Sequence, residues 1–153
     1  KNTDEVLKNW EDIKQETKGQ ETYTDTLKSV PKVFPALMRA QKIGKRAKRA
    51  GMDFDSASDA LKRLKSEISE LEQALNNDDL DEISDELGDI LFSCTNVARF
   101  LDLDAEEALQ NSSDKFIRRF EKVEEQIKLD GIDMKSLGID ELDAYWHKAK
   151  RKN

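Results

Sequence analysis

The sequence predicts an all-α protein built as a helical bundle. The chain has 153 residues with only two prolines and six glycines, so few positions must interrupt a helix. Apolar residues recur at steps of three and four through most of the chain, which is the spacing of one helix face. Charged residues make up 39% and hydrophobic residues 37%, a balance that favours long amphipathic helices or a core shared between subunits.

The first three elements are predicted from caps, breakers and periodicity. Apolar residues at helical spacing predict a helix over residues 3–17, with Thr3 as its N-cap. Residues 18–30 are polar and lack this pattern, so a linker is predicted there. In the second helix, Pro35 suits the first turn and Gly51 follows the last.

The middle of the chain predicts two long helices in succession. A leucine and isoleucine stripe predicts a helix that begins near residue 55 or 56 and ends at about residue 75, and residues 76–79 form a short polar break. The next helix is predicted over residues 80–101. Because residues 87–100 are apolar nearly all round, we expect this helix to be central and buried.

The last third predicts one long and one short helix. The long helix begins at Asp104, and Glu107 three residues later resembles a capping box. Gly131 and Gly138 bracket a loop, and a final helix follows over residues 140–150. The apolar stripe of the long helix consists of Leu109, Phe116, Phe120, Val123 and Ile127.

Charge and cysteine content exclude several classes of protein. The net charge of −7 argues against nucleic acid as the main partner. The only cysteine, Cys94, lies in an apolar run, which excludes a disulfide framework and favours a reducing compartment. No apolar stretch is long enough to span a membrane, and no signal peptide is visible. We therefore expect a cytoplasmic protein that has neither nucleic acid nor a membrane as its partner.

Two acidic pairs lie on the third and fourth predicted helices. Glu67 and Glu70 form an E-x-x-E pair, and Glu86 and Asp89 form an E-x-x-D pair. Residues three apart lie on one face of a helix. Glu67 lies at the edge of the apolar stripe, and the second pair opens the most apolar stretch of the chain.

These pairs are candidates for a metal site. Buried, unpaired carboxylates are costly, and two such pairs on adjacent helices repel each other, so a bound cation resolves both problems. Ligation by oxygen alone favours Mg²⁺, or Mn²⁺ in its place. The alternative is surface acids, because 33 acidic residues produce such spacings by chance. That alternative is favoured for Glu67 and Glu70 taken alone, whereas the apolar helix around Glu86 and Asp89 favours the metal.

A cationic segment on the fifth predicted helix is a candidate for phosphate binding. Lys115 and Arg119 are four residues apart beside the apolar stripe, and Arg118 points further toward solvent. The simpler interpretation is a basic helix surface that pairs with nearby acids. Trp146 is a candidate for stacking on a base, although composition alone favours a residue that anchors the last helix.

The order and spacing of these motifs resemble the MazG proteins, a group of all-α nucleoside triphosphate pyrophosphatases. The resemblance covers nearly the whole chain. Besides the acidic pairs it includes residues 30–40, 50–54, 85–92, 96–99 and 115–120, together with Trp146. The chain carries one set of motifs and is most similar to the C-terminal catalytic domain of members that have two, or to a shortened relative.

The resemblance implies a single catalytic domain over residues 1–153. Within it we expect an N-terminal helix and linker over residues 1–30, core helices over 35–128 and a C-terminal helix over 140–150. Homodimerisation would complete the helical core. The implied reaction is Mg²⁺-dependent hydrolysis of nucleoside triphosphates to a monophosphate and pyrophosphate, with broad specificity and a role in nucleotide-pool housekeeping.

The resemblance also implies the site residues. The metal ligands, expected to serve catalysis, are Glu67, Glu70, Glu86 and Asp89. The implied substrate contacts are Arg63, Asp85, Lys115, Arg118, Arg119 and Trp146. Ser66 departs from the family pattern, since the position before the first metal ligand is often acidic in relatives.

Two other functions compete with hydrolysis. One is a non-catalytic helical module that dimerises and binds a partner, with the carboxylates in ion pairs. The other is DNA binding by the basic helix at residues 39–49, which the acidic net charge disfavours.

Overall fold

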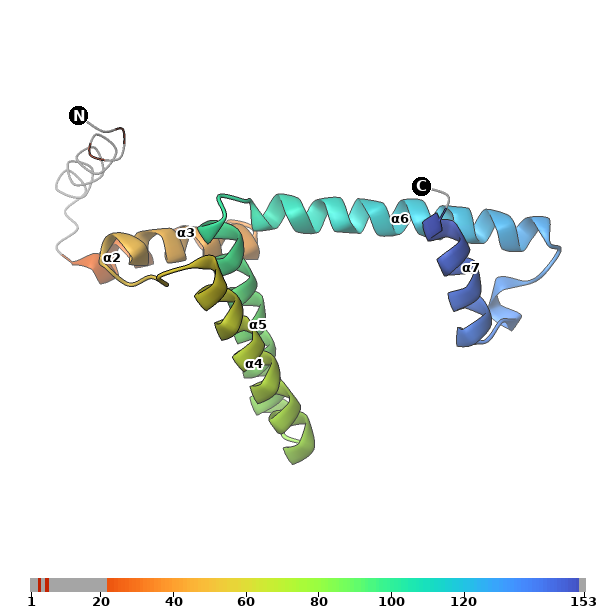
Figure 1. Cartoon of the computed structure of the whole chain (residues 1–153), viewed down its shortest axis with the longest axis horizontal. Coiled ribbons are helices and arrows are strands. Elements are labelled where there is room, and N and C mark those ends of the chain that lie inside the picture. The colour runs from red at the N-terminus through yellow and green to blue at the C-terminus, as the bar shows by residue number, and fades with distance from the viewer. Residues whose placement is uncertain (1–2, 4, 6–21, 152–153) are drawn as a thin grey trace. The chain divides into compact units, whose positions relative to one another are not determined.

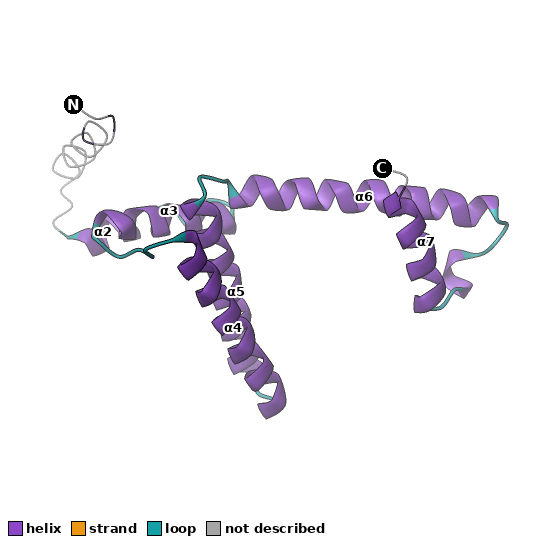
Figure 2. Cartoon of the chain, viewed as in Figure 1, coloured by secondary structure: helices purple, strands orange, loops and turns teal. Residues whose placement is uncertain are grey.

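The structure, a computed structural model, describes residues 3, 5 and 22–151. This part of the chain contains helices and loops and no strand, which confirms the all-α prediction (Figure 1; Figure 2). Most of the helix predicted over residues 3–17 lies outside the described residues. The α-helices are α2 (Tyr23–Lys28), α3 (Ala36–Arg49), α4 (Ala57–Asn77), α5 (Leu80–Phe100), α6 (Ala105–Leu129) and α7 (Ile139–Arg151), and a 3-10 helix spans Met134–Ser136.

The chain divides at residue 106 into two compact units. In the first unit, α4 and α5 run side by side as a helical hairpin, and α3 packs against α5 (Figure 1). Asp78 ends α4 with a left-handed φ of 55°. The carboxylate of Asp79 then accepts hydrogen bonds from the backbone of Asp81 and Glu82 and begins α5. The hairpin turn is therefore only two residues long.

Helix α2 corrects the linker predicted over residues 18–30. The Thr22 hydroxyl accepts a hydrogen bond from the backbone N–H of Asp25 at 3.1 Å, and the Asp25 carboxylate accepts one from Thr22 at 3.2 Å. This capping box begins a six-residue helix that apolar periodicity does not reveal. Because so short a helix is only marginally stable by itself, its stability depends on its contact with α3. There Arg46 donates to Ser29 Oγ at 2.7 Å.

Helix α3 makes two close contacts with the later helices. Gly44 is buried against α5, where an added Cβ would come within 3.0 Å of both Arg99 Nε and Asn96 Oδ1. The absence of a side chain there allows the two helices to approach closely. At the other contact, Gln41 donates to the carbonyl of Leu103 at 2.7 Å and accepts from the N–H of Ala105 at 2.9 Å, which fixes the connection after α5.

Helix α5 is not the buried central helix that its composition predicts. Within the described chain only Ser93 and Thr95 of this helix are buried. Leu87 and Leu91 are 49% and 50% exposed, because α3 and α4 cover only part of the apolar surface. A large part of the apolar surface of α5 is therefore left uncovered in the single chain.

The second unit is built from α6 and α7. Val123, Ile127 and Ala149 form its buried core, and side chains from the loop and α7 pack against it. The apolar stripe predicted for α6 is thus confirmed in its C-terminal part, whereas Leu109 and Phe116 are 53% and 57% exposed. In residues 22–151 no helix combines the length and the apolar character needed to cross a lipid bilayer.

Candidate functional site

The hairpin of α4 and α5 brings the two predicted acidic pairs together. The carboxylate oxygens of Glu67, Glu70 and Glu86 lie within 4.8 Å of one another. A second group within the same distance consists of Asp85, Glu86 and Asp89, so Glu86 belongs to both. The cluster therefore contains all four predicted ligands and Asp85.

Glu67 is the most buried member of the cluster. Its exposed fraction is 6%, and the pKa of its carboxyl is raised by a hydrogen bond with Glu70, by burial and by the negative charge of Glu70. Arg63 opposes this shift, since its Nε lies 3.0 Å from Glu67 Oε1. The Arg63 side chain is 62% exposed, so its other guanidinium donors can reach a ligand.

Glu86 has the most perturbed carboxyl in the site. Burial raises its pKa to about 7, and the charges of Glu70, Asp89 and Glu67 contribute in the same direction. Among the described residues, the Oε2 atoms of Glu67 and Glu86 are buried and have no hydrogen-bond partner. Two orphaned carboxylate oxygens on facing helices are a donor set that a hard cation satisfies.

The geometry fits a small divalent cation. Ligand oxygens around Mg²⁺ lie about 3 to 4 Å apart when each metal–oxygen bond is about 2.1 Å, so oxygens within 4.8 Å need only a small adjustment. The donor set contains only oxygen, which disfavours zinc. The cluster can therefore hold a metal ion.

Raising the pH should destabilise the metal-free protein through Glu86. The folded-state pKa of about 7 lies above the ordinary value of 4.5, so folding favours the protonated form. The stabilisation is complete below pH 4.5 and is lost as the pH rises through about 7. We expect wild type and Glu86→Gln to have similar melting temperatures in chelator near pH 5, and wild type to melt lower at pH 8.

Added Mg²⁺ provides the control for this experiment. At pH 8 it should raise the melting temperature of the wild type and have little effect on Glu86→Gln, because the neutral amide is a poor ligand. Parallel melting curves for the two proteins from pH 5 to pH 8 would contradict the assigned pKa of Glu86.

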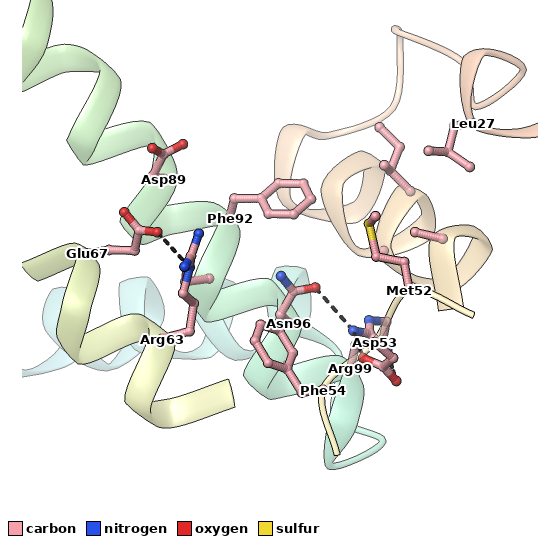
Figure 3. Close-up of a pocket in the computed structure, with 14 residues that line it drawn as sticks. Leu27, Met52, Asp53, Phe54, Arg63, Glu67, Asp89, Phe92, Asn96 and Arg99 are labelled. Atoms are coloured by element: carbon pink, nitrogen blue, oxygen red, sulfur yellow. Dashed lines mark hydrogen bonds and ion pairs between the residues drawn. The ribbon is translucent and has the colours of Figure 1, made fainter. Parts of the chain in front are cut away.

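A cavity of about 550 Å³ adjoins the acidic cluster in the first unit (Figure 3). Glu67, Asp89 and Arg63 line it at the cluster, and residues of α2, α3, α5 and the loop before α4 form the remaining walls. Phe54 and Phe92 are its aromatic lining residues. Its volume falls within the range of about 300 to 1,000 Å³ that is usual for ligand pockets.

A partly buried ion pair lies at the other side of the cavity. Arg99 donates to Asp53 Oδ1 at 2.7 Å and to Oδ2 at 3.2 Å, and the two side chains are 9% and 14% exposed. Hydrogen bonding by Arg99 lowers the pKa of Asp53. Arg99 Nη2 also lies 3.3 Å from Asn96 Oδ1. The pair thus holds both the loop before α4 and an amide on the cavity wall.

The sequence pattern by itself indicates no role for Asp53, Asn96 or Arg99. Asp53 and Arg99 are 46 residues apart, in a loop and a helix, so no periodicity connects them. Both fall in segments that resemble the family, 50–54 and 96–99, and this likeness was the only signal that pointed to them.

The other predicted substrate contacts lie in the second unit. Lys115 and Arg118 are exposed, whereas Arg119 is partly buried, and among the described residues its Nε has no hydrogen-bond partner. Trp146 packs against the core of this unit, and its ring centroid lies 4.9 Å from that of Phe116. Trp146 therefore anchors α7, which is the role that the composition of the sequence favours for it. The residue is only partly buried, so part of its ring remains accessible.

Comparison with known proteins identifies relatives of this chain. Residues 55–124, which span α4, α5 and most of α6, match the MazG nucleotide pyrophosphohydrolase domain. A nucleoside triphosphate pyrophosphohydrolase/pyrophosphatase MazG of Thermotoga maritima is 38% identical over 94% of this chain and 54% of its own length. A nucleoside triphosphate pyrophosphohydrolase of Escherichia coli is 36% identical over 98% of the chain and 58% of its own length.

A third relative is named as uncharacterised. This uncharacterised protein of Bacillus subtilis, YabN, is 37% identical over 95% of the chain and 30% of its own length. The chain thus spans between about a third and somewhat over half of the length of these relatives. The match therefore concerns only the corresponding part of each relative.

Proposed function

Because the chain carries a MazG nucleotide pyrophosphohydrolase domain, we propose that it hydrolyses nucleoside triphosphates to nucleoside monophosphates and pyrophosphate. The observation that carries this proposal is the convergence of two acidic pairs beside a ligand-sized cavity. We further propose broad specificity for ribo- and deoxyribonucleotides and a role in housekeeping of the cytoplasmic nucleotide pool.

Magnesium is the ion that we propose for the cluster, with Mn²⁺ as a substitute. Glu67, Glu70, Glu86 and Asp89 would hold it, and the bound ion would polarise the phosphoryl oxygens and lower the pKa of water. A carboxylate of the cluster that is free of ligation accepts the proton of the attacking water. Arg63, the exposed cation beside these carboxylates, donates to the phosphate chain.

The cations of α6 supply the second part of the proposed mechanism. Lys115, Arg118 and Arg119 bind the triphosphate and neutralise charge that develops on the leaving pyrophosphate. The unpartnered Nε of Arg119 supports this role. The accessible part of Trp146 provides an aromatic contact to the nucleotide.

We also propose that two copies of the chain form a homodimer through the exposed apolar surface of the α4–α5 hairpin. Leu61, Ile68 and Leu75 on α4 are 43%, 43% and 57% exposed, and Leu87 and Leu91 on α5 are about half exposed. A second copy would bury these side chains and complete the core.

Analytical ultracentrifugation should test the dimer. The measured mass should be twice the chain mass of 17.6 kDa, and Leu91→Glu should lower the measured mass toward that of one chain. A monomeric wild type at tens of micromolar would refute the dimer.

The products of nucleotide hydrolysis test the proposed function. The whole chain is incubated with each nucleoside triphosphate and Mg²⁺, and the products are separated by ion-exchange chromatography. We expect a monophosphate and pyrophosphate in equal amounts, because the bond that breaks joins the α- and β-phosphates. Diphosphate and inorganic phosphate would indicate a different phosphohydrolase. If neither Mg²⁺ nor Mn²⁺ supports turnover, the non-catalytic dimerisation and partner-binding module becomes the better interpretation.

A further inference from the structure

We propose that the cavity beside the acidic cluster holds the base of the nucleotide, and that Asn96 donates a hydrogen bond from its Nδ2 atom to an acceptor on that base. This inference rests on the proposed function, since it names the substrate-recognition residue of the same site. It concerns only the first unit, whose helices α2 to α5 and the loop before α4 form the cavity walls.

The position of the cavity follows from the bond that is cleaved. Release of pyrophosphate breaks the link between the α- and β-phosphates, so in the proposed reaction the α-phosphate lies beside the metal ion that the carboxylates would hold. The nucleoside is attached directly to that phosphate and must occupy space that borders the carboxylates. Glu67 and Asp89 belong to the acidic cluster and also line the cavity, which is therefore contiguous with the reacting phosphate.

The lining of the cavity suits a planar aromatic ligand. Ile43 and Ala47 of α3 and the rings of Phe54 and Phe92 provide apolar surface against which a base can pack. Arg63, Glu67 and Asp89 lie at the end nearest the cluster, whereas Asn96 and the Asp53–Arg99 pair lie beyond Phe92 (Figure 3). The two polar ends of the cavity thus match the two polar ends of a nucleotide. The phosphate lies at the end nearest the acidic cluster, and the edge of the base lies at the end that contains Asn96.

The orientation of the Asn96 amide is determined by its neighbours. Arg99 has only donors, so the atom of Asn96 that lies 3.3 Å from Arg99 Nη2 must be the acceptor Oδ1. Arg99 is itself held by two hydrogen bonds to Asp53. Figure 3 shows the Asn96 nitrogen on the side away from Arg99, and within the described chain it has no hydrogen-bond partner. Asn96 therefore presents two N–H donors to the cavity in a fixed direction.

Gly44 contributes to this arrangement. A Cβ at this position would lie 3.0 Å from both Asn96 Oδ1 and Arg99 Nε, so any side chain would displace the amide or the guanidinium. Glycine at this point of α3 thus preserves the geometry of the donor. Because every nucleobase has a carbonyl oxygen or an unprotonated ring nitrogen, a single donor binds all of them and agrees with broad specificity.

A base-free substrate separates recognition of the base from general damage to the enzyme. We expect Asn96→Ala to lower kcat/KM about fivefold to tenfold for ATP, GTP, CTP and UTP, mainly through KM, since one hydrogen bond is lost. For ribose 5′-triphosphate, which has no base, kcat/KM should not change. Asn96→Asp keeps the acceptor that faces Arg99 and replaces the donor with an acceptor, so it should cost at least as much with the four nucleotides. Asn76→Ala, an exposed amide near the end of α4, is the matched control and should have no effect.

Each outcome decides the inference. Equal losses with ribose 5′-triphosphate would mean that Asn96 supports the fold, and no loss with the four nucleotides would mean that the base lies elsewhere; both results overturn the proposal. If the wild type hydrolyses none of these compounds, the proposed function fails by itself. Calorimetric binding of AMP, GMP, CMP and UMP then decides the inference: weaker binding by Asn96→Ala, with no change for ribose 5-phosphate, supports it, and unchanged or absent binding overturns it.

Discussion

Replacing Glu86 or Asp89 with alanine should abolish pyrophosphate release, with kcat reduced by at least about a hundredfold to a thousandfold. Both residues belong to the group of carboxylates within 4.8 Å of one another, so each substitution removes a proposed metal ligand. The metal concentration needed for half-maximal activity should rise as well. Steady-state release of pyrophosphate, measured over a range of Mg²⁺ concentrations, checks both effects.

The same substitutions should leave the fold intact. Asp89 is exposed, and Glu86 is surrounded by carboxylates that repel it in the metal-free protein. Removal of either charge relieves this repulsion, so the melting temperature in chelator should be unchanged or higher. Glu72→Ala is the matched control, because Glu72 is an exposed acid on α4 outside the cluster. Unchanged turnover in Glu86→Ala or Asp89→Ala would refute the assignment of the metal site.

Replacing Asp53 or Arg99 with alanine should lower the free energy of unfolding by about 3 kcal/mol. The two side chains are only 14% and 9% exposed, so removal of one partner leaves the other charge buried and uncompensated. Denaturant unfolding, followed by circular dichroism of the helices, measures the change. The double variant should lose much less than the sum of the two single losses, because no unpaired charge remains.

The behaviour of the Asp53–Arg99 pair in acid gives an independent check. Arg99 holds the pKa of Asp53 below its ordinary value of 3.8, so the carboxylate stabilises the fold above that value. This stabilisation is lost as the pH falls through the lowered pKa. Lys62→Ala is the control, since Lys62 and Asp59 form an exposed pair 3.9 Å apart that should contribute less than about 1 kcal/mol. Additive losses in the double variant would contradict energetic coupling between Asp53 and Arg99.

Local features of the sequence predict most of the fold. The bounds of α3, α4 and α5 agree with the predictions to within about two residues, because caps, glycines and the 3.6-residue period act within one helix. The grouping of Glu67, Glu70, Glu86 and Asp89 is also predicted, because pairs three residues apart on adjoining helices share a face.

Burial depends on contacts that periodicity does not reveal. The sequence favours Glu86 and Asp89 as the enclosed pair, yet Glu67 is the buried residue and Asp89 is exposed. The reason is that α3 and α4 cover α5 only in part, so its apolar composition overstates its burial. The Asp53–Arg99 pair is missed for a similar reason, since it joins a loop to a helix 46 residues away.

The two-residue turn between α4 and α5 has a consequence for how this chain tolerates insertions. Glu70 precedes Asp78 by eight residues and Glu86 follows Asp79 by seven, which at about 1.5 Å per residue places them about 12 and 10 Å from the turn. One residue inserted on either side rotates one pair by about 100° away from the other. The hairpin can therefore change length only when both helices gain or lose whole turns together. After such a change the two acidic pairs still face each other at the same distance from the turn.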